Sequence, residues 1–452
     1  MTTSNESTRR FFMGAATAAS AMRVWGANEK INLAIVGLGG RGTDHLNNYL
    51  RIAQANVMGL CDVNQAARER AQATILKSSS EKAREFEDMR EVFADPKVEA
   101  VSIATPNHWH ALAAIWAMKA GKDVYGEKPA CYNIYEGLKM LQVARDTGRM
   151  LQIGSQHRSN PMKIKAIAAL QGGLIGKIYQ AKGLCYKRRA SIGRKPDTPT
   201  PPGLNWDLFL GPAPMRPFNE LRFKYNWHWF WDTGNGDIGN QGVHELGVAR
   251  WGMSEPEWPK AVYAHGGKFA YDDDQETPNT LTANFEFDGR ELVFEVRGLL
   301  TGAEGGVPRR RGGPATTPSP TATAPQGGGQ PINVMIGNLF YGTEGWAAMS
   351  DQGFQAFKGE SNELVMEERS ERGGNDPTGL HMQNFLAACR SRNHKDLHDE
   401  IGIAYLSASM CHLANISYRV GRKLTLQPGP KFVNDPEANK LLTRDYRKPY
   451  VV

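Results

Sequence analysis

Short apolar runs alternate with helix-length amphipathic stretches over the first third of the chain, from Ile31 onward. This alternation is typical of a parallel sheet whose connecting helices cover both faces. The apolar runs predict five strands at residues 31–36, 57–61, 98–103, 123–125 and 150–153. We therefore expect an α/β protein that begins with a doubly wound parallel sheet of the Rossmann kind.

Two of the connecting segments carry clear helix signals. Residues 108–120 place apolar side chains at helical spacing and stop at Gly121, where a helix is expected to end. Asn133, followed three residues later by Glu136, resembles a capping box. A second helix is therefore expected to begin just after Asn133.

The pattern changes after about residue 155, where longer strand-like runs appear. The Asp288-Gly289 pair between two of these runs predicts a hairpin turn. The second half is thus expected to form an α/β domain that contains a largely antiparallel, open sheet. Its predicted elements are strands at residues 261–265, 281–287, 292–296 and 339–341 and a helix at 402–420.

One segment within this half lacks the composition of a folded element. Residues 301–331 are rich in Gly, Pro, Thr and Ala and cannot supply a core. We expect a disordered insertion between two strands. The resulting division is a Rossmann domain at 28–155, a substrate and oligomerisation domain at 156–426, and an extended C-terminal tail at 427–452.

The first 27 residues differ from everything that follows. Arg9 and Arg10 precede a weakly apolar, Ala-rich stretch, which resembles a twin-arginine export signal. We expect residues 1–27 to direct export of the folded protein to the periplasm. The alternative is a frayed basic N-terminus on a cytoplasmic protein. Because no free nicotinamide pool exists outside the cytoplasm, an exported enzyme of this kind is expected to hold its nucleotide tightly.

Composition narrows the function classes. The chain has 452 residues, 40% of them hydrophobic, enough for two domains with separate cores. Its 54 basic and 47 acidic residues give a net charge of +7 without a basic stripe, so no nucleic-acid partner is expected. The five cysteines are scattered without CxxC spacing, so no metal site is expected. No segment after the N-terminal stretch reaches the roughly twenty apolar residues of a membrane span.

A glycine-rich loop follows the first predicted strand directly. In the segment Gly37-Leu38-Gly39-Gly40-Arg41-Gly42, Gly37 suits the tight turn and Gly39 lets the backbone approach a pyrophosphate. Gly42 lets the helix pack closely on the strand. The N-terminus of that helix then receives phosphate groups. The order of strand, loop and helix therefore predicts a dinucleotide site.

Asp62 ends the second predicted strand, at about the 20-residue distance from the loop that suits a ribose-binding carboxylate. A carboxylate there would bond the ribose hydroxyls and repel a 2′-phosphate, which favours NAD. Arg41 leaves NADP open, because a guanidinium beside the ribose could accept the extra phosphate.

Two further motifs stand at the ends of strands, namely Ala104-Thr105-Pro106-Asn107-His108-Trp109-His110 and Gly126-Glu127-Lys128-Pro129. With the glycine loop, they resemble the glucose-fructose oxidoreductase and inositol dehydrogenase (Gfo/Idh/MocA) family, from about residue 28 to residue 426. The resemblance implies a Rossmann domain, a second domain whose open sheet often forms a homo-oligomer interface, and a substrate between them. It also implies cofactor contacts from Gly40, Thr105, Asn107, His110, Glu127, Lys128 and Gln156.

Lys128 is the first candidate for chemistry. The end of a parallel strand opposite the glycine loop faces the nicotinamide half of a dinucleotide crevice. Burial there lowers a lysine pKa, so that the side chain can bond the reacting hydroxyl and relay its proton. The alternative is a solvated lysine in a turn. The resemblance favours a catalytic lysine and implies a cis bond before Pro129.

His244 is the second candidate, in the glycine-rich segment 234–244. Its unperturbed pKa suits a general base that takes the hydroxyl proton as hydride leaves the same carbon. The family commonly shows an aspartate four residues earlier, where this chain has Asn240. An amide can hold a hydroxyl but carries no charge, and whether nearby Asp237 compensates is left open. The alternative for His244 is a satisfied core histidine.

Several other residues are weaker candidates. The aromatic segment 225–231 could stack against a sugar ring or fill the core. Gln156, Arg158 and Tyr186 are possible substrate or nicotinamide contacts. His412 and Asn415 share a helix face, where two such residues are more often structural.

Three functions fit this reading. The first is an oxidoreductase that moves hydride between a sugar or polyol carbinol and bound NAD. The second is an NAD-dependent glycosidase that oxidises the sugar transiently so that the aglycone is eliminated. The third is a non-catalytic sugar or nucleotide sensor, which the amide at position 240 keeps open.

Overall fold

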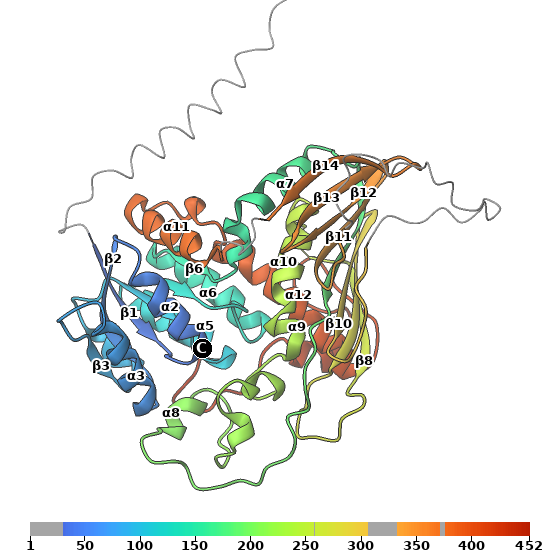
Figure 1. Cartoon of the computed structure of the whole chain (residues 1–452). Helices are drawn as coiled ribbons and strands as arrows, with labels where there is room; N and C mark the ends of the chain where they lie inside the picture. The colour runs from blue at the N-terminus through green and yellow to red at the C-terminus, as the bar shows by residue number, and fades with distance from the viewer. Residues whose placement is uncertain (1–29, 257, 306–331, 371–375) are drawn as a thin grey trace, which may run out of the picture.

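The computed structural model describes residues 30–256, 258–305, 332–370 and 376–452, which form two sheets with helices between and around them (Figure 1). The predicted export signal at 1–27 and most of the predicted insertion, residues 306–331, lie outside the described residues. No helix in the described ranges has the length and apolar character that a membrane crossing requires.

The first sheet confirms the predicted doubly wound fold. Its six strands are parallel and run in the order β3-β2-β1-β4-β5-β6, so the strand order reverses between β1 and β4. Ligands bind outside the carboxyl ends of the strands at such a reversal. The strands are β1 (Ile31–Val36), β2 (Ala55–Cys61), β3 (Arg84–Phe86), β4 (Ala100–Ile103), β5 (Asp123–Gly126) and β6 (Leu151–Ile153).

Strand β3 was not predicted from the sequence. It has three residues, and of these only Phe86 is buried while Arg84 and Glu85 are exposed. A single apolar residue produces no periodic signal. Pairing of β3 with the edge of β2 is therefore a tertiary effect that the local pattern does not contain.

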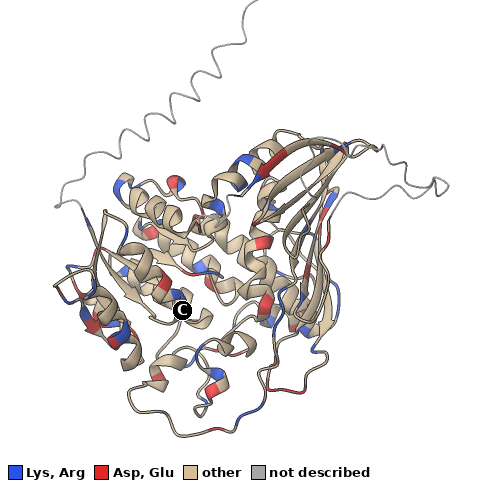
Figure 2. Ribbon diagram, viewed as in Figure 1, with Lys and Arg blue, Asp and Glu red and all other residues tan. Residues whose placement is uncertain are grey.

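Five helices connect the strands of this sheet, and both predicted helix signals are confirmed. Helix α5 ends one residue before the predicted boundary, and Asn133 Oδ1 accepts the Glu136 N–H at 2.9 Å at the start of α6. The reach-back differs from the usual capping box, because Glu136 accepts from Tyr132 N rather than from Asn133 N. The helices are α2 (Gly40–Tyr49), α3 (Gln65–Ile75), α4 (Met89–Ala94), α5 (Asn107–Lys119) and α6 (Ile134–Thr147). In Figure 2, basic and acidic positions alternate along the ribbon of α3.

The second sheet has nine strands and is largely antiparallel, as predicted. Its order is β14-β13-β12-β11-β7-β10-β9-β8-β15, and the pair β7 and β10 is the parallel exception. The strands are β7 (Ile178–Cys185), β8 (Ala261–Gly267), β9 (Thr280–Phe287), β10 (Arg290–Arg297), β11 (Ile336–Gly342), β12 (Gly345–Ser350), β13 (Gly353–Lys358), β14 (Glu363–Arg369) and β15 (Leu424–Thr425).

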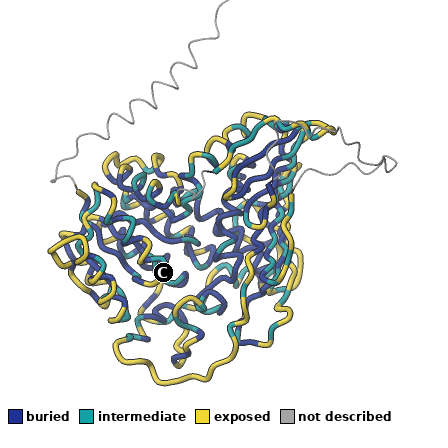
Figure 3. Tube along the Cα trace, in the orientation of Figure 1, coloured by how far each residue is buried: buried dark blue, intermediate teal, exposed yellow. Residues whose placement is uncertain are grey.

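Helices cover one face of this second sheet (Figure 1). Phe285, Phe294 and Phe340 point from the sheet into the core that α10 and α12 also line. Helix α12 is buried along most of its length because it also packs against α6 of the first domain. Figure 3 shows the resulting continuous buried band between the two domains. The helices on this side are α7 (Pro161–Gln171), α9 (Gly236–Asn240), α10 (Gly242–Gly252) and α12 (Ile401–Val420), whereas α11 (Thr378–Ser391) packs against α2 and β5 of the first domain.

A long connection between β7 and α9 crosses back to the first domain. Gly203 O accepts the Gln65 N–H at 2.8 Å, and Asn205 N donates to Val63 O at 2.9 Å, so the two backbones pair antiparallel around Leu204. We call residues 203–211, which include the short helix α8 (Trp206–Leu210), the strap. The strap fastens the second domain to the loop that follows β2.

The predicted tail holds the strap from the other side. It is mostly extended but contains a short helix, α13 (Pro436–Lys440), that the sequence reading did not anticipate. Arg447 donates to Asp207 Oδ1 at 2.6 Å and to Gly211 O at 2.8 Å. Tyr450 packs edge-on against Trp109 of α5. The tail therefore joins the strap to the first domain.

Candidate active site

A cleft of about 960 Å³ lies between the carboxyl edge of the first sheet and the second domain. The first domain contributes the glycine loop and the ends of β2, β4 and β5. The second domain contributes residues between 187 and 244. The predicted site residues that line the cleft are Gly37, Gly39, Gly40, Arg41, Asp62, Thr105, His110, Glu127, Lys128, Gln156, Asn240 and His244.

The glycine loop has the geometry of a phosphate-binding turn. Gly37 has a φ of +89°, and a Cβ there would lie 2.6 Å from Ala104 O, so only glycine fits. A Cβ on Gly42 would lie 1.8 Å from Gly37 O, which is the close helix–strand approach expected at that position. By contrast, a Cβ on Gly39 or Gly40 would meet nothing within 4 Å. The loop is thus tight against the strand and open toward the cleft at the N-terminus of α2.

Asp62 lies at the adenosine end of the cleft. Its Oδ2 accepts the Leu38 N–H at 2.6 Å and its Oδ1 accepts the Asn64 N–H at 2.8 Å. Burial raises the pKa of this carboxyl, and the two backbone donors oppose the rise. Each oxygen retains lone-pair capacity for a ribose hydroxyl. The carboxylate therefore joins the glycine loop to the loop after β2.

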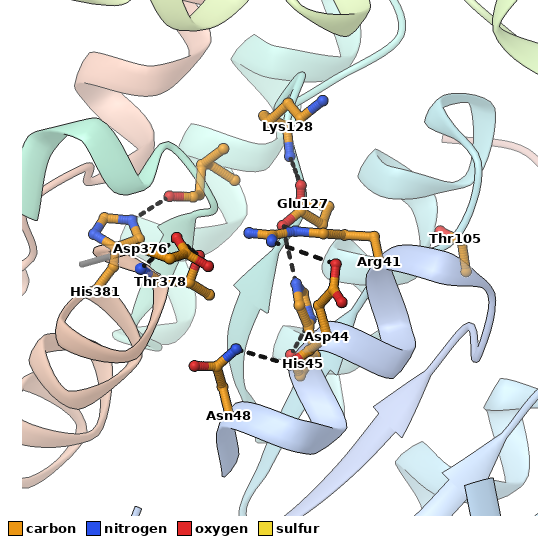
Figure 4. A network of polar contacts seen from close by, with 12 residues as sticks. Arg41, Asp44, His45, Asn48, Thr105, Glu127, Lys128, Asp376, Thr378 and His381 are labelled. Atoms are coloured by element: carbon orange, nitrogen blue, oxygen red, sulfur yellow. Dashed lines mark hydrogen bonds and ion pairs between the residues drawn. The ribbon is translucent and has the colours of Figure 1, made fainter. Parts of the chain in front are cut away.

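Arg41 points away from Asp62, which removes the physical argument for NADP. Arg41 Nε donates to Glu127 Oε1 at 2.7 Å, and His45 Nε2 lies 2.9 Å from the same oxygen (Figure 4). Although burial opposes it, Arg41 and His45 hold the pKa of Glu127 well below its usual range. Glu127 is thus a buried anion that fixes the guanidinium at the nicotinamide end.

Lys128 follows Glu127 and enters the cleft. Its Nζ donates to Asn240 O at 2.6 Å and lies 3.4 Å from Asn240 Oδ1. Burial lowers the pKa of this lysine against the opposing charge of Glu127. The Lys128–Pro129 bond is cis, as the family resemblance implied.

His244 lies in the first turn of α10 and lines the same cleft. It is buried, and among the described residues its Nδ1 has no hydrogen-bond partner. Burial, with the nearby charge of Lys128, lowers the pKa of His244 well below its usual value. The His157 ring lies 5.0 Å away between centroids. His244 is therefore a neutral imidazole with an uncommitted nitrogen.

Asp237 does not replace the family aspartate. Its two carboxylate oxygens accept from Arg189 Nη2 at 2.6 Å and Nε at 2.9 Å. Asn240 Nδ2 donates to Tyr225 OH at 2.8 Å and lies 3.3 Å from Asp237 Oδ1. Asn240 therefore orients Lys128 and Tyr225, while the charge of Asp237 is committed to Arg189.

Two predicted cofactor residues have other partners. Asn107 does not line the cleft, and its Nδ2 donates to Asn235 Oδ1 at 3.0 Å between the domains. His110 lines the cleft, but its two ring nitrogens lie 2.7 Å from Pro129 O and 2.8 Å from Thr105 O. His110 therefore fixes the backbone that carries Lys128.

The weaker candidates separate into structural residues and cleft residues. Arg158 pairs with Glu255 and Asp399 and, like Tyr186, lies outside the cleft lining. The shared face of His412 and Asn415 bonds backbone carbonyls, which favours the structural reading. In the aromatic segment 225–231, the cleft is lined by Tyr225, Trp227 and His228, whereas Trp229 and Phe230 are buried core.

Some cleft residues were missed by the sequence reading. Lys187 and Gln241 line the nicotinamide end, and Leu208, Phe209 and Phe223 line the cleft from the strap region. The basic run that begins at Lys187 was a detectable signal. The sequence around the aromatic residues of the strap region contains no signal for a site, because long-range pairing with the loop after β2 brings them to the cleft.

The residues present fit a nicotinamide dinucleotide. Buried polar atoms of Thr105, Gln156 and Arg41 at the cleft have no hydrogen-bond partner among the described residues. An open glycine loop, a ribose-side carboxylate and a buried lysine at the far end complete the arrangement. The fold and the cleft together define an NAD-binding protein of the oxidoreductase class.

Comparison with known families agrees with this class. The NAD-binding Rossmann-fold model of the GFO/IDH/MocA oxidoreductase family matches residues 31–155. The model of that family's C-terminal alpha/beta domain matches residues 162–266. The chain belongs to the Gfo/Idh/MocA oxidoreductase family.

Characterised relatives match over a limited stretch. Inositol 2-dehydrogenase of Salmonella typhimurium is 30% identical over 158 residues, 34% of this chain and 46% of that protein. The scyllo-inositol 2-dehydrogenase (NAD(+)) of Bacillus subtilis is 31% identical over 156 residues, 34% and 44%. An alpha-N-acetylgalactosaminidase of Shewanella oneidensis is 24% identical over 158 residues, 34% of each chain. The chain thus spans less than half the length of these relatives.

Solved structures share the whole fold. Levoglucosan dehydrogenase in complex with NADH and levoglucosan gives a TM-score of 0.64 at 16% identity, covering 88% of this chain and 99% of that one. An aldose-aldose oxidoreductase from Caulobacter crescentus gives 0.62 at 16% identity, covering 88% and 100%. At these identities the likeness shows the two-domain fold alone.

Proposed function

We propose that the protein is an NAD-dependent oxidoreductase that transfers hydride between a sugar or polyol carbinol carbon and a tightly bound nicotinamide nucleotide. One observation carries the proposal: Lys128 and His244, from different domains, line a single cleft with the glycine loop and Asp62. Relatives named inositol dehydrogenases support a polyol substrate.

The residues divide the work along the cleft. The glycine loop and the N-terminus of α2 would hold the pyrophosphate, and Asp62 the adenosine ribose. Thr105, Glu127 and Gln156 lie toward the other end. The bound nucleotide supplies the hydride acceptor or donor.

The protein side chains remove the proton of the substrate hydroxyl. The Lys128 ammonium donates a hydrogen bond to the reacting oxygen, held in place by Asn240. As the carbinol C–H bond breaks, the O–H proton passes to His244, whose neutral imidazole accepts it. The lowered pKa of His244 keeps the imidazole unprotonated near neutral pH, and the same burial makes it a weaker base than a free imidazole.

Retention of the nucleotide is supported by the strap. Leu208 and Phe209 line the cleft from the strap. The first residues of the strap pair with the backbone that follows Asp62. His108 Nε2 lies 2.9 Å from Phe209 O, and Trp109 Nε1 donates to Leu208 O at 3.0 Å. A nucleotide under this wall leaves only when several contacts break together.

A second candidate is an NAD-dependent glycosidase, favoured by the relative named alpha-N-acetylgalactosaminidase. In that reaction, oxidation acidifies the C–H bond beside the new carbonyl, the aglycone is eliminated, and hydride returns. The two candidate reactions differ in their products. Solvent deuterium at the carbon beside the oxidised position, with aglycone release, identifies elimination.

The decisive experiment begins with the released nucleotide. Mass spectrometry of denatured, freshly purified protein is expected to show NAD or NADH. Addition of candidate sugars and polyols, both neutral and acidic, is then expected to identify one that reduces the bound nucleotide in the wild type. In the Lys128→Ala variant, the rate of nucleotide reduction is expected to fall by about a hundredfold or more, because a group used in proton transfer is lost.

Wild-type turnover by Lys128→Ala would contradict the catalytic assignment. Protein that contains and binds no nicotinamide nucleotide would contradict the proposal as a whole. Turnover of any kind excludes the sensor.

We also propose that residues 1–27 direct export to the periplasm, on the strength of Arg9-Arg10 and the Ala-rich stretch that follows. A further part of the proposal is homo-oligomerisation through the outer face of the nine-stranded sheet. Figure 1 shows no described helix over that face.

A further inference from the structure

Lys187 extends the cationic end of the cleft beyond Lys128. It follows β7 by two residues and lines the cleft beside Gln241, whose Oε1 lies 3.4 Å from its Nζ. Within the described residues no carboxylate forms an ion pair with it. Lys187 is exposed, so its ammonium group reaches the rim of the cleft without a carboxylate partner among the described residues.

The charges around the cleft are divided between the domains. All its acidic lining residues come from the first domain, whereas the charged lining residues of the second domain are Lys187 and Lys224. The acidic residues are Asp44, Asp62, Glu87 and Glu127.

The acids near Lys128 are already committed. Glu127 is bonded to Arg41 and His45, and Asp237 forms a two-pronged pair with Arg189. Burial, together with the charges of Arg41 and Lys187, lowers the pKa of Lys128 against the opposing effects of Glu127 and Asp237. Lys187 therefore lies close enough to Lys128 for the two positive charges to interact.

Two ammonium groups that lie close together repel each other and attract an anion, even in a cleft whose opposite wall carries acids. The neutral groups beside them, Tyr225, Asn240 and Gln241, suit sugar hydroxyls. A neutral polyol would use those groups and leave the ammonium of Lys187 unpaired.

We infer that the substrate is an acidic sugar, whose carboxylate or phosphate contacts Lys187 while its carbinol carbon faces Lys128 and His244. The inference rests on the proposed function, because it assigns a substrate class to the same cleft. It separates this protein from a dehydrogenase of neutral inositols. Lys187 is a binding residue for the anionic group and takes no part in hydride transfer.

The test uses the holoenzyme and matched substrates. Glucose is compared with glucuronate and with glucose 6-phosphate, and galactose with galacturonate, by reduction of the bound nucleotide. The variants are Lys187→Met and Lys187→Arg, with Lys177→Met as control, since Lys177 is exposed and outside the cleft.

We expect the acidic member of each pair to be preferred in kcat/KM. Lys187→Met lowers kcat/KM for the acidic member by about tenfold or more, because a charge-assisted contact is lost, and changes the neutral member by less than about twofold. Lys187→Arg retains most of the preference, and Lys177→Met retains all of it. Preference for glucuronate or for the phosphate ester tells which anion the site takes.

Two outcomes overturn the inference. The first is a higher kcat/KM for the neutral member of each pair. The second is an equal loss of kcat/KM for both members in Lys187→Met, which would mean that Lys187 acts by changing the pKa of Lys128. Calorimetric titration with glucuronate and glucose 6-phosphate separates this inference from the redox proposal. Salt-sensitive binding that Lys187→Met abolishes supports an acidic ligand even if no sugar is oxidised. If neither acidic sugar binds, the inference fails whatever the redox result.

Discussion

Asp62 shows how one carboxylate can serve both the fold and the choice of cofactor. It bonds backbone N–H groups of the glycine loop and of the loop after β2, and it is the acid expected at the adenosine ribose. Asp62→Asn keeps an acceptor oxygen of similar shape but removes the negative charge. Because one of the two backbone N–H groups then faces an amide NH2, the variant tests the charge and the loop contact of Asp62 together.

For Asp62→Asn, we expect NAD affinity to fall by about tenfold, because a charge-assisted hydrogen bond becomes a neutral one. Discrimination against NADP is expected to shrink. The measurement is the dissociation constant of each nucleotide for stripped protein. Asp44→Asn, which changes a mainly exposed acid of the same cleft, is the control, and equal effects of the two substitutions would contradict the role of Asp62.

For single residues, the sequence predicts where a residue lies in the fold better than it predicts where its side chain points. Gly37, Asp62 and Lys128 lie at the ends of strands, so the order of elements brings them to one edge. The direction of Arg41 depends on the buried acid at Glu127, far away in sequence. A place beside the ribose, which would leave NADP open, therefore has no support from this side-chain direction.

The strap is the element that joins the second domain to the loop after β2. Its pairing with residues 63–65 depends on two backbone hydrogen bonds, one of them donated by Asn205 N to Val63 O. Asn205→Pro removes that donor, whereas Asn205→Ala keeps it. Both lose the Asn205 side chain, which accepts from Leu208 N at the start of α8. The pair therefore isolates the strap bond.

We expect the nucleotide to dissociate about tenfold faster from Asn205→Pro than from Asn205→Ala, in line with the loss of a backbone hydrogen bond and local order. The measurement is nucleotide release from the holoenzyme after dilution into an excess of a scavenging dehydrogenase. Matching release rates in the two variants would show that the strap does not hold the cofactor.

Helices and strands were predicted correctly where a long hydrophobic pattern marks them. They were missed where long-range backbone pairing determines the structure. The strands at 31–36 and 281–287 and the helix at 402–420 match β1, β9 and α12 closely. Strand β14 has no fully buried residue, so alternation is weak there. The strap's bridge at Leu204 joins residues far apart in sequence, which no local pattern contains.

The whole molecule leaves one broad surface for association. Tyr263 and Val293 alternate with the buried residues of β8 and β10 and so lie on the outer face of the second sheet. We expect the wild type to be a dimer or larger assembly in solution. Tyr263→Glu combined with Val293→Glu is expected to dissociate it, because unpaired carboxylates at an interface core are costly.

Light scattering coupled to size-exclusion chromatography measures this mass. The control is Met215→Glu, which changes an exposed apolar residue near the strap. A monomeric wild type, or dissociation by the control as well, would contradict an interface on the sheet.

The contacts made by the tail also set an order of events during biosynthesis. Arg447 and Arg444 hold carbonyls at the end of the strap, and Tyr450 seals the space against Trp109. These residues leave the ribosome after both sheets have been made. The tail therefore adds its contacts to the wall of the nucleotide cleft after the first domain and the strap have been synthesised.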